Sequence, residues 1–160
     1  MDIRNMIIGD YDAVIGLLTA TSGVRLRDAD SREATARYLE RNPGLSFVAV
    51  VDGVIVGCVM CGHDGRRGYL QHLAVSETHR RLGIGSTLVE ACLTRLESLG
   101  IRKTHIDVLI ENQQAQDFWR RRGWHKRDDI FRYSFVTGHD ANVQHRAGAS
   151  GAALEFWLER

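Results

Sequence analysis

The sequence contains no apolar run long enough to cross a membrane, and its N-terminus lacks the apolar stretch of a secretory signal. The 21 basic and 20 acidic residues leave a net charge of +1, so composition gives no electrostatic reason to expect nucleic acid or a membrane as partner. The three cysteines are too few for a disulfide framework and are typical of a reducing compartment. These absences predict a cytoplasmic protein.

Two of the cysteines, Cys58 and Cys61, have the Cys-x-x-Cys spacing found in zinc and redox sites. They fall in a strand-like apolar run that begins at Val54. Positions three apart on a strand face opposite sides of the sheet, and no second cysteine pair completes a tetrahedral site. We therefore predict buried thiols that pack as small apolar side chains, and no metal.

The 160 residues and 44% hydrophobic composition are enough to bury one core, which favours a single domain. After Thr137 the sequence becomes rich in small and polar residues and has little apolar content. We predict a folded domain over residues 1–136 and a flexible C-terminal tail over residues 137–160.

The first half of the sequence predicts a short strand, two helices and a hairpin. Asp10 is placed to cap the first helix, and Asp30 with Glu33 has the spacing of a capping box at the start of the second. Asp52-Gly53 favours a turn with positive φ and joins the two strands of the hairpin. The predicted strands are residues 2–8, 45–51 and 54–61.

The second half predicts alternating strands and helices. A helix from Ile84 to Gly100 has apolar residues at helical spacing, and a second helix ends at Gly123. The predicted strands are residues 69–75, 103–109, 124–126 and 130–136. The order of elements predicts an α/β fold in which helices flank a mixed sheet.

The turn between residues 75 and 84 has the features of an anion site. Gly83 and Gly85 stand at the start of a helix, where the absence of a Cβ lets the backbone approach a ligand. The first-turn amides of a helix have no helical partners and favour an anion, and Arg80 and Arg81 add charged donors. The arrangement suits a pyrophosphate. It lacks the Lys-Ser/Thr ending of a nucleotide P-loop and the third glycine of a dinucleotide fingerprint.

At this point the sequence resembles the GCN5-related N-acetyltransferase (GNAT) family. Arg80, Gly83 and Gly85 match its Arg-x-x-Gly-x-Gly/Ala signature. A second match, in the expected order and at the expected separation, runs from Asn112 to Trp124 and corresponds to Asn-x-x-Ala-x-x-Phe-Tyr-x-x-x-Gly-Phe. The resemblance covers roughly the first 135 residues and is nearest to the ribosomal-protein alanine acetyltransferase branch.

The resemblance implies a GNAT acyl-CoA N-acyltransferase fold, with a mixed central sheet of six to seven strands and about four helices. It implies an N-acetyltransferase that moves an acetyl group from acetyl-CoA to a primary amine by direct attack on the thioester. Backbone groups of the strand ending at Val75 would hold the pantetheine arm, and the Val75 amide would stabilise the oxyanion. The residues that the resemblance places at the acetyl-CoA site are Leu73, Ala74, Val75, Arg80, Arg81, Leu82, Gly83, Ile84, Gly85, Ser86, Asn112, Phe118 and Trp119.

The resemblance also suggests a catalytic base. Asp107 matches the position of the glutamate base of the alanine acetyltransferase branch. An aspartate with an ordinary pKa near ~3.9 is a weak direct base, so a water relay or local tuning would be needed. A partly solvated strand residue is the alternative role of Asp107. Glu111, His72 and Tyr69 are further candidates.

Trp119 departs from the family pattern, because the family usually has a tyrosine there that protonates the departing thiolate. An indole donates a hydrogen bond but is not an acid in this range. Trp119 is therefore assigned to the site without the acid role, and Tyr133 would replace the phenol only if the fold brought it close.

Several alternatives stay open at the level of sequence. Residues 120–122, three consecutive arginines, are either a solvated helix face or a docking patch for the 3′-phosphate of CoA. Arg25 and Arg27 are either surface residues or part of an acceptor site for a carboxylate or phosphate.

An acyl-CoA-binding sensor or scaffold without useful turnover is the rival function. The acceptor amine, a small molecule or a protein N-terminus or lysine, is not identified. A homodimer is expected through Trp124, Phe131 and Phe135.

Overall fold

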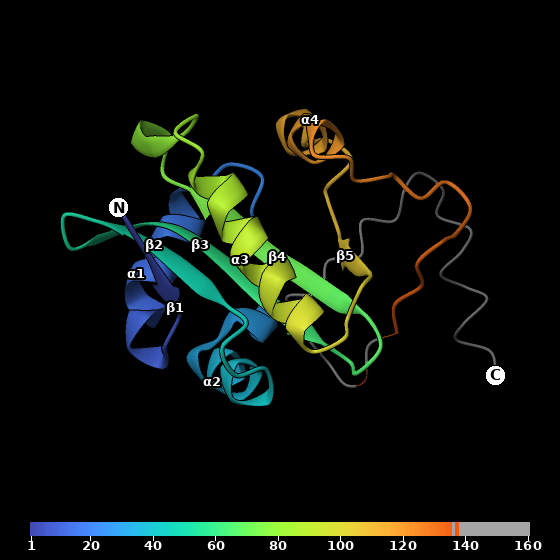
Figure 1. The fold of residues 1–160 in the computed structure, drawn as a ribbon, viewed down its shortest axis with the longest axis horizontal. Helices are drawn as coiled ribbons and strands as arrows, with labels where there is room; N and C mark the ends of the chain where they lie inside the picture. The colour runs from blue at the N-terminus through green and yellow to red at the C-terminus, as the bar shows by residue number, and fades with distance from the viewer. Residues whose placement is uncertain (136, 138–160) are drawn as a thin grey trace. The chain divides into compact units, whose positions relative to one another are not determined.

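The computed structural model describes residues 1–135 and 137, and within them a five-stranded mixed sheet forms the centre of the fold (Figure 1). The strands are β1 (Asp2–Asn5), β2 (Phe47–Val51), β3 (Val54–His63), β4 (Gly68–Val75) and β5 (Thr104–Ile106). The helices are α1 (Tyr11–Ala20), α2 (Arg32–Arg41), α3 (Ile84–Ser98) and α4 (Gln113–Arg121). This is the predicted α/β fold with four helices, although the sheet has five strands where six to seven were expected.

The strands follow one another in chain order across the sheet. β1 to β4 pair antiparallel, whereas β5 returns through α3 and pairs parallel to β4. The predicted hairpin turn is confirmed, because Asp52 and Gly53 have φ of 49° and 78° and connect the paired residues Val51 and Val54. The single parallel pair sets up the site described below.

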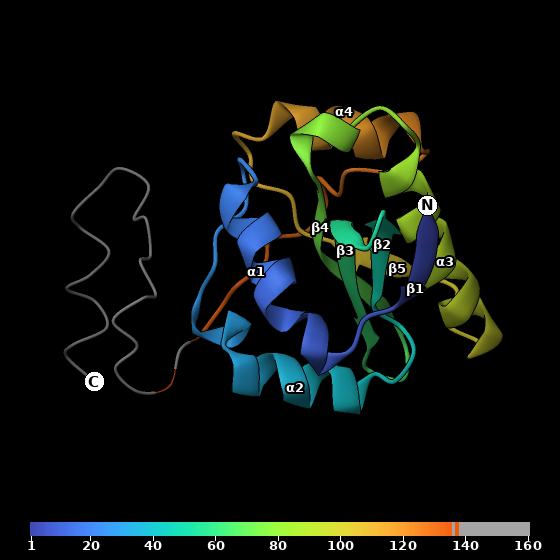
Figure 2. The same ribbon diagram turned by 90° about the vertical axis from the view of Figure 1, so that its left-hand side faces the viewer.

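Helices cover both faces of the sheet, as Figure 2 shows. On one face α1 and α2 close a core that contains Val14, Leu18 and Cys58. On the other face α3 closes a core that contains Leu88, Cys92 and Leu96 together with Trp119 of α4. The molecule therefore buries an apolar layer on each side of the sheet.

The prediction that Cys58 and Cys61 are buried thiols is confirmed. Cys58 and Cys61 are fully buried on β3, in the cores on opposite faces of the sheet, and neither forms a disulfide. Burial raises the pKa of the Cys58 thiol to about 12. A thiol held neutral in this way packs as an apolar side chain, as predicted.

The predicted cap of α2 is wrong, and Asp10 is the N-cap residue of α1 as predicted but its side chain forms no capping hydrogen bond to that helix. Ser31 caps α2, because its hydroxyl accepts from Ala34 N at 3.2 Å, so Asp30 and Glu33 form no capping box there. The Asp10 carboxylate accepts from Ile7 N at 2.9 Å and thereby caps the 3₁₀ turn that precedes α1. The hydrogen bond from Arg4, at 2.7 Å, lowers the pKa of Asp10 and keeps it ionised.

The two last predicted strands are also wrong where the structure describes them. Residues 124–126 and 130–135 form no strand, and Val136 lies outside the described residues. Trp124 N donates to Trp119 O at 3.1 Å, and the two indole rings pack with centroids 4.6 Å apart. The chain therefore turns back onto α4 after Gly123, where a strand would have had to pair with β5.

The chain divides into two units, residues 1–127 and residues 128–160. The predicted domain boundary after residue 136 stays a prediction, and the predicted tail lies outside the described residues except for Thr137. Among the described residues, no helix is both long and apolar enough to span a membrane.

Candidate active site

A cleft opens where β4 and β5 stop pairing. The two strands are matched at three positions only, and the last pair is Leu70 with Ile106. Beyond it the strands diverge and line opposite walls of a cleft of about 560 Å³, with residues 73–75 on one wall and residues 106–109 on the other. At the paired end the strands are held close, because a Cβ on Gly68 would stand 2.6 Å from Leu96 Cδ1 and 2.8 Å from Thr104 Oγ1. The fold therefore builds a slot between neighbouring strands.

A bulge in β4 lies beside the slot. Met60 pairs with Gln71 and Cys58 pairs with Ala74, so Val59 alone faces His72 and Leu73. His72 takes up the extra residue with a φ of 52°, which is uncommon for any residue other than glycine. The extra residue shifts the register of β4 against β3, and so it determines which backbone groups at the end of β4 point into the slot.

The Val75 amide points into the slot. Successive residues of a strand direct their backbone groups to alternate edges. Ser76 N donates to Val56 O of β3 at 2.8 Å. Val75 N–H, one residue earlier, therefore points away from β3, toward the space that β5 has left. This is the amide to which the family resemblance assigns the oxyanion.

The turn into α3 presents unpaired amides to the same cleft. Gly83, the N-cap of α3, has a φ of 81°, and Thr87 N is the first amide to bond back, to Gly83 O at 3.0 Å. The amides of residues 84–86 therefore have no helical acceptor. Arg81, with a φ of 64°, and residues 83–86 all line the cleft. Leu82 is 66% exposed and does not line it.

Glycine occupies the two positions of this turn for different structural reasons. A Cβ on Gly83 would meet no atom within 4 Å, so only its positive φ demands glycine. A Cβ on Gly85 would stand 3.3 Å from the Phe118 ring, so Gly85 lets α3 and α4 pack closely. The sequence assigned both glycines to the approach of a ligand, and the structure adds this packing role for Gly85.

Arginines surround the anion turn. The Arg80 Nε donates to Val75 O at 3.1 Å and so fixes the turn that follows β4. Arg122 donates to the Ser86 hydroxyl and lies over the Phe118 ring, 3.6 Å from its centroid. Burial, and then the charge of Arg121, lowers the pKa of Arg122. Both Arg121 and Arg122 line the cleft, whereas Arg120 pairs with Asp117 at 3.0 Å.

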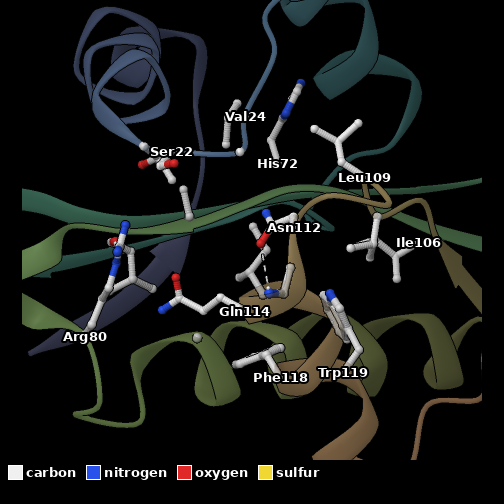
Figure 3. A pocket seen from close by; sticks show the side chains of 18 of the residues that line it. Ser22, Val24, His72, Arg80, Ile106, Leu109, Asn112, Gln114, Phe118 and Trp119 are labelled. Carbon is white, nitrogen blue, oxygen red and sulfur yellow. Dashed lines mark hydrogen bonds between the residues drawn. The ribbon is translucent and has the colours of Figure 1, made fainter.

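Asn112, at the start of α4 in Figure 3, joins two parts of the site, which are α4 and the loop between α1 and α2. Its Oδ1 accepts from Ala115 N at 3.0 Å, so it caps α4. A Cβ on Gly23 would clash with the Asn112 amide, so the loop between α1 and α2 lies directly against it. Arg25 of that loop pairs with Glu111 at 2.5 Å. These contacts bring the loop that holds Arg25 and Arg27 to the mouth of the cleft.

Trp119 is both a core residue and a wall of the cleft. It is 6% exposed, and its ring packs edge-on against Phe118 with centroids 5.0 Å apart. Among the described residues no group accepts a hydrogen bond from its indole nitrogen, which points toward the interior of the pocket in Figure 3. Tyr133 belongs to the separate unit of residues 128–160.

The candidate bases are placed differently. Asp107 lines the cleft and is exposed. The Glu111 carboxylate is engaged with Arg25, and Tyr69 lies on the paired part of the strands, 3.4 Å from Asp64 Oδ2. His72 lines the cleft, and its Nε2 lies 2.6 Å from Oδ1 of Asp30. Sequence reasoning missed Asp30 as a site residue, because its capping-box spacing accounted for it and no local signal links residues 42 positions apart.

Residues 1–135 and 137 contain no group of three or more His, Cys, Asp or Glu side chains arranged to hold a metal ion. A slot that opens between two strands and ends at an anion-binding helix start suits a long thioester with a pyrophosphate, which is the shape of acetyl-CoA. The chemistry of the lining therefore agrees with a CoA ester as the ligand.

Comparisons with known proteins agree with this chemistry. The sequence profile of the acetyltransferase (GNAT) family matches residues 11–124. An acetyltransferase of Pectobacterium atrosepticum is 36% identical over 112 residues, 70% of this chain and 79% of the relative. The N-alpha-acetyltransferase 30 of Schizosaccharomyces pombe is 28% identical over 127 residues, 73% of this chain and 84% of the relative.

The fold is also that of a solved aminoglycoside N-acetyltransferase in complex with CoA. The two agree with a TM-score of 0.69 and 21% identity over 85% of this chain and 95% of that one. The co-substrate of the present protein is acetyl-CoA, and its reaction is the transfer of the acetyl group to an amine. The chain belongs to the acetyltransferase (GNAT) family.

Proposed function

We propose that acetyl-CoA lies in the cleft between β4 and β5, with its pyrophosphate on the amides of residues 81–86. The observation that carries this assignment is the coincidence of the strand gap with the unpaired amides at the start of α3. Leu73, Ala74 and Val75 offer backbone groups to the pantetheine arm. Arg121 and Arg122 line the cleft beside the pyrophosphate turn, where Arg122 donates to Ser86, and would hold the 3′-phosphate.

The thioester would lie beside Val75, whose amide is the donor for the oxyanion that forms when the amine attacks. Asp107, on the opposite wall, stands at the position of the family's base and would need a water relay to receive the amine proton. Asn112 would bond to the pantetheine arm or keep β4 and β5 apart where the slot opens.

The acceptor would enter past the loop of residues 21–27. Two acceptor classes have support among the similar proteins, because one named relative is an N-alpha-acetyltransferase and one similar structure is an aminoglycoside acetyltransferase. Arg25 and Arg27 at this mouth favour an acceptor that carries a carboxylate or phosphate in addition to its amine.

The rival function is an acyl-CoA-binding sensor or scaffold with little turnover. It is suggested by Trp119, which stands where the family usually has a tyrosine. Steady-state release of free thiol from acetyl-CoA separates the two. We expect release with at least one amine among a short peptide with a free N-terminus, lysine, a polyamine and an aminoglycoside. Tight binding of acetyl-CoA without thiol release from any of the four would favour the sensor.

Trp119 gives a prediction about leaving-group protonation. Its ring packs in the core, so Trp119→Phe should lower turnover only a fewfold, and Trp119→Tyr should preserve or raise it by restoring a phenol. The physical reason is that a thiol with a pKa near ~8.5 leaves without a strong acid. Turnover and acetyl-CoA affinity are measured for both variants. A hundredfold loss of kcat in the Phe variant, with affinity unchanged, would mean that the indole N–H supplies an essential hydrogen bond.

We also propose a cytoplasmic homodimer. The three free, buried cysteines support a reducing compartment. Trp124 packs on Trp119 in the structure, so Phe131 and Phe135 are the remaining apolar candidates for an interface. Light scattering at micromolar concentration should return about twice the chain mass of 18.0 kDa. A mass of 18.0 kDa would contradict the dimer.

A further inference from the structure

Two hollows meet at His72. The acetyl-CoA cleft and a second hollow, bordered by residues 27–31 and by α2, share four lining side chains, which are those of Arg25, Arg27, His72 and Asp107. Only the first hollow contains the anion turn. The shared residues therefore mark where the donor cleft meets a separate space open to an acceptor.

His72 is held firmly in this position. A φ of 52° in the middle of a strand persists only where the surrounding structure maintains it. The His72 carbonyl accepts from the buried Cys58 thiol at 3.5 Å, and the ring nitrogen lies 2.6 Å from Asp30. The side chains of His72 and Asp30 are 19% and 12% exposed. Figure 3 shows His72 on the side of the pocket toward Val24, opposite Phe118.

The contact with Asp30 fixes the tautomer of His72. Burial raises the pKa of Asp30, but the hydrogen bonds from His72 and from Arg27 N outweigh it, so the net pKa is lowered. An ionised carboxylate only accepts hydrogen bonds, so His72 Nε2 carries a proton and donates. Nδ1 then has a free lone pair, and no described group donates to it. A base whose other nitrogen is held by a carboxylate is the arrangement seen in many catalytic histidines.

We propose that His72 is the general base that deprotonates the acceptor amine, with Asp30 as its positioning residue. The inference rests on the proposed acetyl transfer. His72 Nδ1 takes one proton from the ammonium form of the acceptor, and the freed nitrogen attacks the thioester carbonyl carbon, forming the C–N bond. Collapse of the adduct breaks the C–S bond, the second nitrogen proton passes to the thiolate, and the imidazolium returns its proton to water.

His72 suits this step better than Asp107. Both side chains face the shared space, and the cations Arg25 and Arg27 line it as well. Histidine titrates nearer neutral pH than a carboxylate, so an imidazole accepts an amine proton more readily. Asp107 is exposed and can still attract the cationic amine to the cleft.

The test compares three substitutions. His72→Asn adopts the left-handed backbone but has no base, His72→Gly leaves room for added imidazole, and Asp107→Asn is the competing candidate. Thiol release is followed against pH with the amine that gives the highest rate, and acetyl-CoA affinity is measured by calorimetry. At neutral pH both His72 variants should lose about a hundredfold in kcat/KM with unchanged acetyl-CoA affinity. The loss should shrink as pH approaches the pKa of the amine, and imidazole should partly restore His72→Gly.

Asp30→Asn should keep measurable activity but move the acidic limb of the pH profile, because the imidazolium loses its counter-charge. A His72→Asn variant within threefold of the parent enzyme would overturn the inference, as would a loss that is constant with pH and not restored by imidazole. A parent enzyme that releases no thiol with any amine would overturn the acetyl transfer itself, and this inference with it.

Discussion

Replacement of Gly83 by valine should abolish the binding of acetyl-CoA. Gly83 has a φ of 81°, a conformation that a β-branched residue does not adopt without strain, and it lines the cleft at a point where a Cβ would meet open space. The variant would both turn the anion-binding amides and fill the space that the pyrophosphate needs. Calorimetry should detect no binding at acetyl-CoA concentrations that saturate the parent protein.

Gly100 provides the matched control at the other end of α3. It has a φ of 79°, and a Cβ there would also meet no atom within 4 Å. Gly100→Val should therefore suffer a similar loss of stability, about 1–3 kcal/mol, and keep its affinity for acetyl-CoA. If Gly83→Val binds acetyl-CoA as well as the parent protein, the pyrophosphate is not held at this turn.

Local sequence signals predicted most of the fold because they depend on a few neighbouring residues. Asp52-Gly53 determines its turn by backbone preference, and Gly100 ends α3 for the same reason. Asn112 caps α4 through its own side chain, which is again a contact between near neighbours in the sequence. The anion turn is a local signal as well, because the glycines and the helix start are adjacent in sequence.

The features that the sequence did not reveal depend on contacts between distant residues. The pattern of residues 124–126 is compatible with a strand, but Trp124 instead packs on Trp119. The spacing of Asp30 and Glu33 predicts a capping role for Asp30, whereas in the structure Ser31 caps α2 and Asp30 pairs with His72. The local sequence around His72 and around Asp30 does not show that the two residues are in contact. His72 was therefore only one of several further candidates for the catalytic base.

Removal of the Val75 amide hydrogen should have the largest effect on turnover. Val75→Pro has no N–H, and because Val75 N–H points away from β3, the substitution breaks no hydrogen bond of that ladder. Loss of one oxyanion donor costs about 3–4 kcal/mol of transition-state stabilisation, so kcat should fall about 10²–10³-fold. Acetyl-CoA affinity should fall much less, since the pyrophosphate contacts are untouched.

Two controls test whether this effect comes from the amide. Val75→Ala keeps the N–H and should retain nearly parental kcat. Ala74→Pro lies one residue earlier, where the N–H faces Cys58 of β3, so it should instead lower the melting temperature by removing a ladder hydrogen bond. A Val75→Pro variant that folds, binds acetyl-CoA and turns over within tenfold of the parent enzyme would exclude the Val75 amide as the oxyanion donor. The donor would then have to be another backbone amide or side chain that lines the cleft, since Val75 is the last residue of β4 whose amide points into the gap.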